Sequence, residues 1–423
     1  MQRLVIIILL GVLTISCTSK NTKLAVAKPN PPNCDCTQTP TQLPPNAQSG
    51  KFEPGTEPTT IKPDNKVPDY SLLKPSRWEE IDGLMEDDLS AAWDAWLQSC
   101  STLKNKPQWQ PACSAAKALT KPNNAAIVAY LTTQFDVYTA TNQDGSNTGL
   151  ITGYYEPLLQ GSRKPSSQYP YPLYRQPNDL VTVELADLYP ELKFKRIRGK
   201  IIDTKQGTKK LIPYMTRAEI EANPSPLAGN EIVWINDIID VFFLQIQGSG
   251  LVNLDNGQQV HVGYADQNGH AYNSIGRLLI DKGELTADQA SMQGIKNWAR
   301  NNLDKLRDLL NSNPSYVFFR ELPADLPGPL GALGVPITAE RSVAIDPKYV
   351  PLGAPLFLST TQPNSAKPLK RLMMAQDTGG AIKGGARADF FWGAGDAAGK
   401  QAGAMKQQGK IWVLLPKGFV LPK

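Results

Sequence analysis

Between residues 78 and 135 the hydrophobic positions repeat with a helical period. Apolar residues return every three or four positions from Trp78 to Leu97, and again from Asn124 to Thr133. This spacing lines one face of a helix with apolar side chains. We therefore expect two amphipathic helices. Their tryptophans could form sugar platforms, but at helical spacing a place in the core is favoured.

From residue 149 onward the period becomes strand-like. Short apolar runs are separated by turn residues, which is typical of a β-barrel or β-sandwich. The expected strands cover 150–156, 193–195, 201–202, 232–234, 238–246, 313–319, 335–337, 343–345, 355–358 and 411–415. The run Phe242–Gly250 alternates apolar residues with glutamines and ends in a Gly-Ser-Gly turn.

Helical patterns interrupt the strands at four places. Longer ones cover 275–280, 287–299 and 303–310. A short one begins after Thr216, an N-cap type of residue, and carries Glu219 at its third helical position, as in a capping box.

Length and charge set limits on the class of protein. A chain of 423 residues predicts two or three domains, and its 41% hydrophobic content is that of a globular protein. The formal charge of +5 is small and argues against a nucleic-acid partner.

The N-terminus resembles an export signal. Arg3 precedes an apolar run from Leu4 to Ile15 that is short for a membrane span, and Ser16 precedes Cys17. We expect residues 1–17 to be a lipoprotein-type signal with Cys17 as the acylated residue; ordinary cleavage or an uncleaved anchor are the alternatives. Residues 18–70 hold ten prolines and few large apolar residues, so we expect a disordered tether.

Four further cysteines are Cys34, Cys36, Cys100 and Cys113. Export permits disulfides, and the last two flank a turn where a bridge could form. Three pairings are possible and the sequence does not choose among them. The cysteine spacing and the two histidines fit no zinc site, and no metal is expected.

The candidate chemistry lies between Ala375 and Gly399. This stretch holds Asp377, Asp389 and Asp396, and nine glycines occur in the 31 residues from 379 to 409. Glycosidic bonds are usually cleaved by carboxyl groups. The apolar run 390–392 follows Asp389, and an apolar wall raises a carboxyl pKa. Asp377 and Asp389 could therefore share one cleft; otherwise one caps a turn and the other lies at the surface.

Other chemistries fit the residues less well. Ser249 lies in Gly-Ser-Gly but not in a G-x-S-x-G motif, so a structural turn is favoured over a catalytic triad. Lys383 follows glycines, but the spacing of a phosphate-binding loop is missing. Tyr154, Tyr155 and Tyr264 suit sugar faces, although each alone is more typical of packing.

Six motifs in order resemble the family of membrane-bound lytic murein transglycosylase A. They are TGYYEP, LQIQGSG, YADQNGHAYNSIGRLLID, NPSYVFF, SVAIDPKYVPLGAPLFL, and RLMMAQDTGGAIKGGARADFFWGAGDAAG followed by GKIWVLLP. The resemblance covers roughly residues 149 to 416. It implies a mainly β fold with helices, in which a double-psi β-barrel domain is interrupted by a smaller inserted β-domain, with a substrate groove between them. On this chain the barrel domain would comprise 71–156 and 284–423, and the insertion 157–283.

The resemblance also implies an activity. These enzymes cleave the β-1,4 bond between N-acetylmuramic acid and N-acetylglucosamine without water and leave 1,6-anhydromuramoyl ends. One aspartate acts as acid and then as base. The motif places it at Asp389, with Asp377 as a supporting neighbour and Asp396 as the alternative. The residues implied to line the groove are Thr152, Gly153, Tyr154, Tyr155, Gln247, Gly248, Ser249 and Tyr264.

The implied setting is the periplasmic face of the outer membrane. We expect a monomer without cofactor, bound to glycan strands, attached to the membrane through Cys17 and open to contacts with wall-synthesis proteins; a soluble periplasmic or secreted form is the alternative. Two other functions remain open at this stage. One is a glycan hydrolase on the same type of barrel, and the other is a non-catalytic, expansin-like wall-binding protein.

Overall fold

The computed structural model describes residues 68–195 and 197–421. The predicted signal at 1–17, the acylated Cys17, the cysteines at 34 and 36, and all but the last residues of the predicted tether at 18–70 lie outside these ranges. Among the described residues, every helix is too short or too polar to cross a bilayer.

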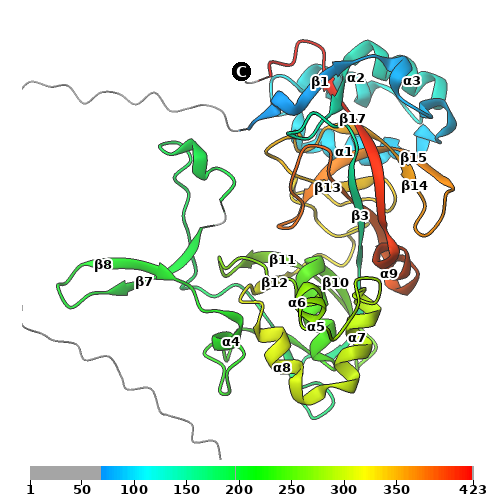
Figure 1. The fold of residues 1–423 in the computed structure, drawn as a ribbon. Helices are drawn as coiled ribbons and strands as arrows, with labels where there is room; N and C mark the ends of the chain where they lie inside the picture. Colours follow the sequence, from blue (N-terminus) through cyan, green and yellow to red (C-terminus); the bar gives the residue numbers. More distant parts are fainter. Residues whose placement is uncertain (1–67, 196, 422–423) are drawn as a thin grey trace, which may run out of the picture. The chain divides into compact units, whose positions relative to one another are not determined.

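The described chain contains runs of helices between runs of strands (Figure 1). The helices are α1 (Trp93–Leu103), α2 (Gln110–Ala118), α3 (Asn124–Gln134), α4 (Arg217–Ile220), α5 (Ile238–Gln247), α6 (Ile275–Asp281), α7 (Met292–Asn301), α8 (Leu303–Asn311) and α9 (Gly395–Ala404). Short 3-10 turns occur at η1 (Tyr70–Leu72), η2 (Trp78–Glu80), η3 (Leu84–Glu86), η4 (Leu89–Ala92) and η5 (Pro190–Leu192).

The strands form three sheets. They are β1 (Leu73–Ser76), β2 (Phe135–Ala140), β3 (Gly149–Glu156), β4 (Leu158–Ser162), β5 (Tyr171–Tyr174), β6 (Val181–Thr182), β7 (Arg198–Asp203), β8 (Lys209–Pro213), β9 (Glu231–Ile235), β10 (Ser249–Leu254), β11 (Gln259–Gln267), β12 (Val317–Glu321), β13 (Ser342–Ile345), β14 (Pro355–Thr361), β15 (Pro368–Thr378), β16 (Ala388–Ala394) and β17 (Lys406–Pro416).

The first sheet closes into a six-stranded barrel. Its order is β17-β14-β15-β13-β16-β3, and β3 pairs again with β17. Two of its pairings are parallel, β13 with β15 and β3 with β16. Closure leaves no free edge on these six strands, and β2 and β1 extend the sheet beyond β17. The mainly β fold built on a double-psi β-barrel is thus confirmed.

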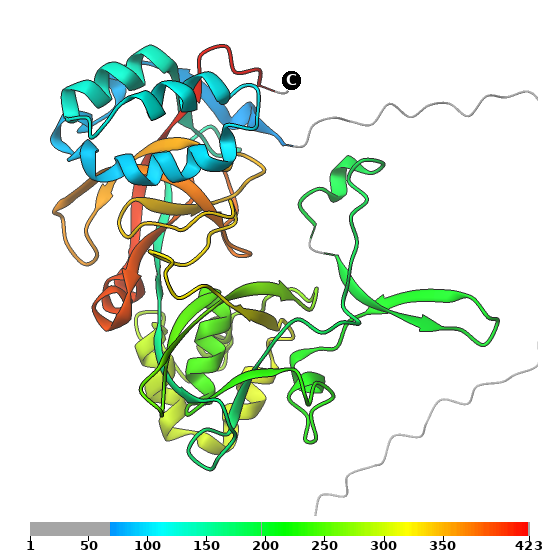
Figure 2. The same cartoon turned by 180° about the vertical axis from the view of Figure 1, so that it is seen from behind.

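Helices α1, α2 and α3 gather beside the barrel strands, as Figures 1 and 2 show from two sides. Their apolar faces and the barrel form one hydrophobic core. In this core the rings of Trp96 and Phe135 contact edge to face, with 5.7 Å between their centroids. The buried tryptophans Trp93 and Trp96 confirm the preference for core over sugar platform. A disulfide joins Cys100 and Cys113, one of the pairings left open by the sequence.

The second sheet holds six strands in the order β12-β11-β10-β4-β9-β5. The chain enters it directly from the barrel, because β3 ends at Glu156 and β4 begins at Leu158 after a single proline. Strand β12 still pairs with β11. The second sheet therefore continues beyond residue 284, where the chain was predicted to return to the barrel domain. We therefore propose an insertion that ends near residue 321.

The predicted strand at 238–246 is wrong, because this segment is helix α5. Asp237 caps its start by accepting a hydrogen bond from the backbone N–H of Ile239 at 2.8 Å, and Gly248 ends it with φ at 86°. Val241 packs on the second sheet while Phe242 packs on the helices α6–α8. A helix buried on two sides has a nearly continuous apolar run, which hides its period.

Three further expectations differ from the structure. Residues 193–195 follow η5 as a turn, and 335–337 make only an isolated bridge through Pro336. The helix expected from Trp78 to Leu97 is broken into 3-10 turns, and the regular helix begins only at Trp93. The capping box at α4 is confirmed, with Thr216 and Glu219 bonded reciprocally.

Candidate active site

Four neighbouring barrel strands place the two predicted aspartates in one row of paired residues across the sheet. Asp377 on β15 pairs with Ala344 on β13, Ala344 pairs with Asp389 on β16, and Asp389 pairs with Thr152 on β3. Residues paired across strands project from the same face of a sheet. Two strand spacings separate the aspartates, which is roughly 10 Å between Cα atoms. Strand register therefore places both aspartates on one face of the sheet.

A β-bulge gives Asp377 this orientation. The pairing of β13 with β15 shifts between Val343 and Ala344, which leaves Gln376 as the extra residue. The Gln376 amide turns inward and donates to the carbonyl of Ala95 at 2.8 Å. Asp377 consequently lies on the same face as Ala344 and not in the main core.

The face that carries Asp389 has an apolar floor. Ala388 and Phe390, its neighbours on β16, belong to the main core, whereas Phe391 joins a small cluster on a separate apolar patch. The other members of this cluster are Tyr154, Ile337, Ala344 and Ile382. The apolar surroundings expected of the aspartates are therefore present, and they come from three strands and two loops.

The carboxyl group of Asp389 has a raised pKa. Burial raises the pKa of Asp389 from 3.8 to about 6. The hydroxyl of Thr152 donates to its carboxylate and lowers the pKa, as does the charge of Arg387, while the charge of Asp377 raises it. Desolvation thus exceeds the opposing contributions.

Arg387 is a member of the site to which the sequence analysis assigned no role. Its Nη2 donates to Oγ1 of Thr152 at 2.8 Å, and its Nη1 donates to the carbonyl of Leu150 at 3.2 Å. Thr152 in turn donates to Asp389. The position two residues before Asp389 on an extended segment is a signal that could have indicated it, because such residues share one face.

Hydrogen bonds from a phenol and from the backbone contact Asp377. It accepts hydrogen bonds from the hydroxyl of Tyr154 at 3.0 Å and from the backbone N–H groups of Ala332 and Thr378 at 2.9 Å. Burial, followed by the charge of Asp377, raises the pKa of Tyr154 well above its ordinary value, so the phenol stays protonated and donating. The backbone of Ala332 could not have been found from the sequence.

Gly153 faces away from the two aspartates. A Cβ atom there would lie 2.7 Å from Nε1 of Trp392 and 2.9 Å from Cα of Ala402, so the residue allows β3 to pack closely against these groups. Tyr155 packs with Ala402 in the same region. Both are neighbours of α9, where Asp396 lies in the first turn.

The predicted site residues of the inserted region gather at the end of α5. Oε1 of Gln247 accepts from the backbone N–H of Tyr155 at 3.0 Å, which links α5 to β3. Gly248 ends α5, Ser249 begins β10, and Cβ of Tyr264 lies 3.9 Å from the Cβ position at Gly248. These residues therefore form a second group, joined to the first through β3.

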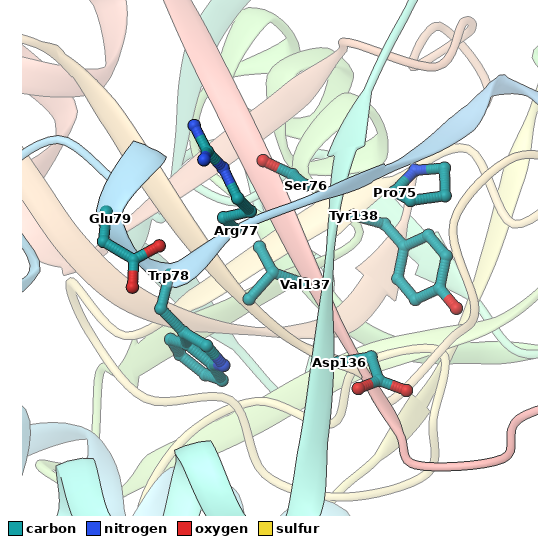
Figure 3. Close-up of a pocket in the computed structure, with 8 residues that line it drawn as sticks. All are labelled: Pro75, Ser76, Arg77, Trp78, Glu79, Asp136, Val137 and Tyr138. Atoms are coloured by element: carbon teal, nitrogen blue, oxygen red, sulfur yellow. The ribbon is translucent and has the colours of Figure 1, made fainter.

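The hollow in Figure 3 lies elsewhere and is lined by residues of η2, β1 and β2 and their neighbours: Pro75, Ser76, Arg77, Trp78, Glu79, Asp136, Val137 and Tyr138. None of them is a predicted site residue. The described part of the chain brings together no group of three His, Cys, Asp or Glu that could hold a metal ion.

Fold and site together define a closed six-stranded barrel that carries two aspartates on one face of its sheet. Two family models match the chain: the "MltA specific insert domain" over residues 150–320 and the "3D domain" over residues 341–415. The membrane-bound lytic murein transglycosylase A of Escherichia coli K12 is 34% identical over 288 residues, which cover 66% of this chain and 69% of that protein.

Two solved structures are similar in fold. MltA from Neisseria gonorrhoeae is 36% identical with a TM-score of 0.69, over 82% of this chain and 93% of that one. E. coli MltA with bound chitohexaose is 26% identical with a TM-score of 0.58, over 78% and 91%. The chain belongs to the membrane-bound lytic murein transglycosylase A family.

Proposed function

We propose that this protein is a lytic transglycosylase that cleaves the β-1,4 bond between N-acetylmuramic acid and N-acetylglucosamine in peptidoglycan. Asp389 is the single acid and base. The observation that carries the proposal is its environment: a half-buried carboxyl whose pKa is raised to about 6 on a barrel strand of this family. A group that must first give and then accept a proton works best with a pKa near the working pH.

The reaction needs two proton transfers, both through the carboxyl group of Asp389. Protonated Asp389 donates its proton to the glycosidic oxygen while the bond from that oxygen to C1 of the muramoyl residue breaks. The resulting carboxylate then removes the proton of the C6 hydroxyl, and O6 forms a new bond to C1. Asp389 ends protonated as it began, no water is consumed, and the product has a 1,6-anhydromuramoyl end.

Thr152 and Arg387 support the second half of this cycle. The hydroxyl of Thr152 donates to the carboxylate form of Asp389, and Arg387 orients that hydroxyl by donating to its oxygen. Asp377 supports the first half, because its negative charge raises the pKa of Asp389. Tyr154 and two backbone N–H groups fix Asp377 in place.

Glycan recognition is proposed for the residues around this centre. The E. coli relative has been solved with bound chitohexaose, a chain of N-acetylglucosamine units. We place the sugar contacts at Thr152, Tyr154, Tyr155, Gln247, Gly248, Ser249 and Tyr264, along a groove between barrel and insertion. Gly153 contributes by letting Trp392 pack beneath β3.

The cellular setting is part of the proposal. The E. coli relative is named a membrane-bound enzyme. We propose that the chain is exported, attached through acylated Cys17 to the outer membrane, and works as a monomer in cell-wall turnover beside wall-synthesis proteins.

Product analysis tests the activity. Purified glycan strands are incubated with the protein, and the released fragments are examined by mass spectrometry. Anhydromuramoyl ends, 18 mass units lighter than reducing ends, support the proposal. Reducing ends indicate a hydrolase instead, and binding without cleavage indicates an expansin-like wall-binding protein.

The pH dependence of cleavage should shift to higher pH when Thr152 is replaced with valine. Activity requires protonated Asp389 at the start, so it is present below the pKa of about 6 and is lost as the pH rises through that value. The Thr152 hydrogen bond lowers this pKa, and its removal raises it. We expect the basic limb of kcat/KM to move up by roughly one pH unit.

Thr133→Val is the matched control. Thr133 lies on α3, and among the described residues its hydroxyl bonds only to the carbonyl of Ala129. Its pH profile should coincide with that of the wild type. A basic limb that stays in place or moves down in Thr152→Val contradicts the role given to this hydroxyl.

A further inference from the structure

Strands β7 and β8 form a hairpin, Arg198–Pro213, that we call the basic hairpin (Figure 1). Five residue pairs hold it together, from Gly199 with Pro213 to Asp203 with Lys209. With β6 it makes a three-stranded sheet in which β8 is an edge strand. The hairpin is a regular structure whose side chains are largely exposed.

Apolar side chains stand in solvent on both faces of the hairpin. Ile201 and Leu211 are paired across the strands and are 51% and 43% exposed. Ile202 projects from the opposite face and is 38% exposed. Six of the thirteen large hydrophobic residues exposed in the described chain lie between Leu185 and Leu211. Such a concentration marks a surface for interaction.

Positive charge is concentrated in the sixteen residues of the basic hairpin. The hairpin holds five Lys or Arg against one Asp, a net charge of +4, where the whole chain has +5. Asp203 pairs with Lys209 at 3.2 Å. Lys200, Lys205 and Lys210 form no salt bridge with any residue that the structure describes. The ligand of this surface is therefore anionic, and small apolar groups suit the isoleucine and leucine side chains.

The base of the hairpin is fixed to a strand of the candidate site. Nε of Arg198 donates to both carboxylate oxygens of Asp266 at 2.9 Å, and both side chains are largely buried. The hydroxyl of Tyr264, a predicted sugar contact, donates to the same carboxylate at 3.4 Å. The basic surface thus begins two residues along β11 from the proposed glycan site.

We propose that the basic hairpin binds the acidic peptides that substitute the glycan strand. This inference rests on the proposed function, because it assumes that the polymer at Tyr264 is peptidoglycan. In that polymer the muramoyl residues carry short peptides with free carboxylates and alanine methyl groups. A glycan strand in contact with Tyr264 brings such peptides beside the hairpin, where Lys205, Lys209 and Lys210 meet the carboxylates.

Two other occupants fit less well. A second copy of this chain adding to the edge strand β8 would bring two hairpins of net charge +4 together, and edge lysines oppose such pairing. A lipid surface would receive apolar residues at the tip, whereas the tip from Thr204 to Thr208 is polar and contains Lys205. Peptide carboxylates agree with both the lysines and the polar tip.

The test compares two soluble substrates, glycan strands that retain their peptides and the same strands after an amidase has removed them. The triple variant Lys205→Gln, Lys209→Gln, Lys210→Gln should raise KM about tenfold on peptide-bearing strands, because each exposed ion pair contributes modestly. Its KM on bare strands should equal that of the wild type. In the wild type only, the difference in KM between the two substrates should become smaller at high salt.

The control is Lys104→Gln, Lys117→Gln, Lys367→Gln, three exposed lysines of the barrel domain. It removes the same charge and should change neither KM. An equal change on both substrates, or none, overturns the inference. So does a loss of binding to anionic phospholipid vesicles with an unchanged KM, which would assign the hairpin to the membrane.

A failure of the proposed function gives a different result. In that case wild-type protein produces no anhydromuramoyl ends from either substrate. Binding of fluorescently labelled peptide-bearing and bare strands, measured by anisotropy, then decides the role of the hairpin independently of cleavage. The inference is retained only if the hairpin variant loses affinity for the peptide-bearing strand alone.

Discussion

Replacing Asp389 with asparagine is expected to abolish cleavage and at the same time to stabilise the protein at neutral pH. Asparagine has nearly the same shape but can neither donate a carboxylic proton nor accept one. We expect the rate of anhydromuramoyl formation to fall by about 10³-fold or more, since general acid–base catalysis alone contributes a factor of this order. Release of anhydro products is the measurement.

The stabilisation follows from the sign of the pKa shift. Asp389 has a pKa of about 6 in the folded protein and 3.8 as its ordinary value. Between these values the folded state holds a proton that the unfolded state has lost, so the wild type loses stability as the pH rises through this window. The full shift corresponds to about 3 kcal/mol. Asparagine does not titrate, so the variant escapes this loss.

Urea unfolding of both proteins at pH 3.5 and pH 8 measures the effect. The free-energy difference between variant and wild type should be small at the lower pH and favour the variant by up to about 3 kcal/mol at the higher one. Asp325→Asn, at an exposed aspartate, is the control and should change stability by about 0.5 kcal/mol or less at both pH values. Full activity in Asp389→Asn, or a stability difference that ignores pH, would falsify the role of this residue.

Local patterns in the sequence predicted the elements whose burial is simple. The strands at 343–345, 355–358 and 411–415 lie within β13, β14 and β17, because buried barrel strands read as short apolar runs bounded by turn residues. Helix α5 was missed because its apolar run lacked a helical period. Its capping residues, Asp237 and Gly248, were nevertheless clear. The capping residues at the two ends of α5 indicated a helix more clearly than the apolar residues between them.

The closure of the barrel could not be read from any local pattern. Strand β3 lies between β16 and β17, although more than two hundred residues separate them in the chain. The hydrogen bond from Thr152 to Asp389 spans 237 positions. Residue types alone suggested a pair of aspartates, and the order of motifs singled out Asp389. The desolvation that supports this choice depends on the fold.

Removing the carboxylate of Asp87 is expected to destabilise the fold by about 3–5 kcal/mol. Asp87 is fully buried and accepts from both terminal nitrogens of Arg341, at 2.7 and 3.0 Å, and from the backbone N–H of Leu372 at 2.8 Å. In Asp87→Ala the charge of Arg341 stays buried without its partner, which is the costly way to break such a pair. Urea unfolding at pH 7 measures the loss, with the exposed Asp325→Ala as the control, expected to change stability by about 0.5 kcal/mol or less.

The double variant Asp87→Leu, Arg341→Met separates the cost of an orphaned charge from the value of the pair itself. Burying two apolar side chains removes both charges together, so we expect most of the lost stability to return. Arg341 directly precedes β13, the strand that places Ala344 between Asp377 and Asp389. If the double variant recovers stability but cleaves slowly at saturating substrate, the buried pair also positions the catalytic strands. If it recovers both, the pair acts only as an anchor between the N-terminal segment and the barrel. A double variant that is no more stable than Asp87→Ala would contradict the assumption that the orphaned arginine causes the loss.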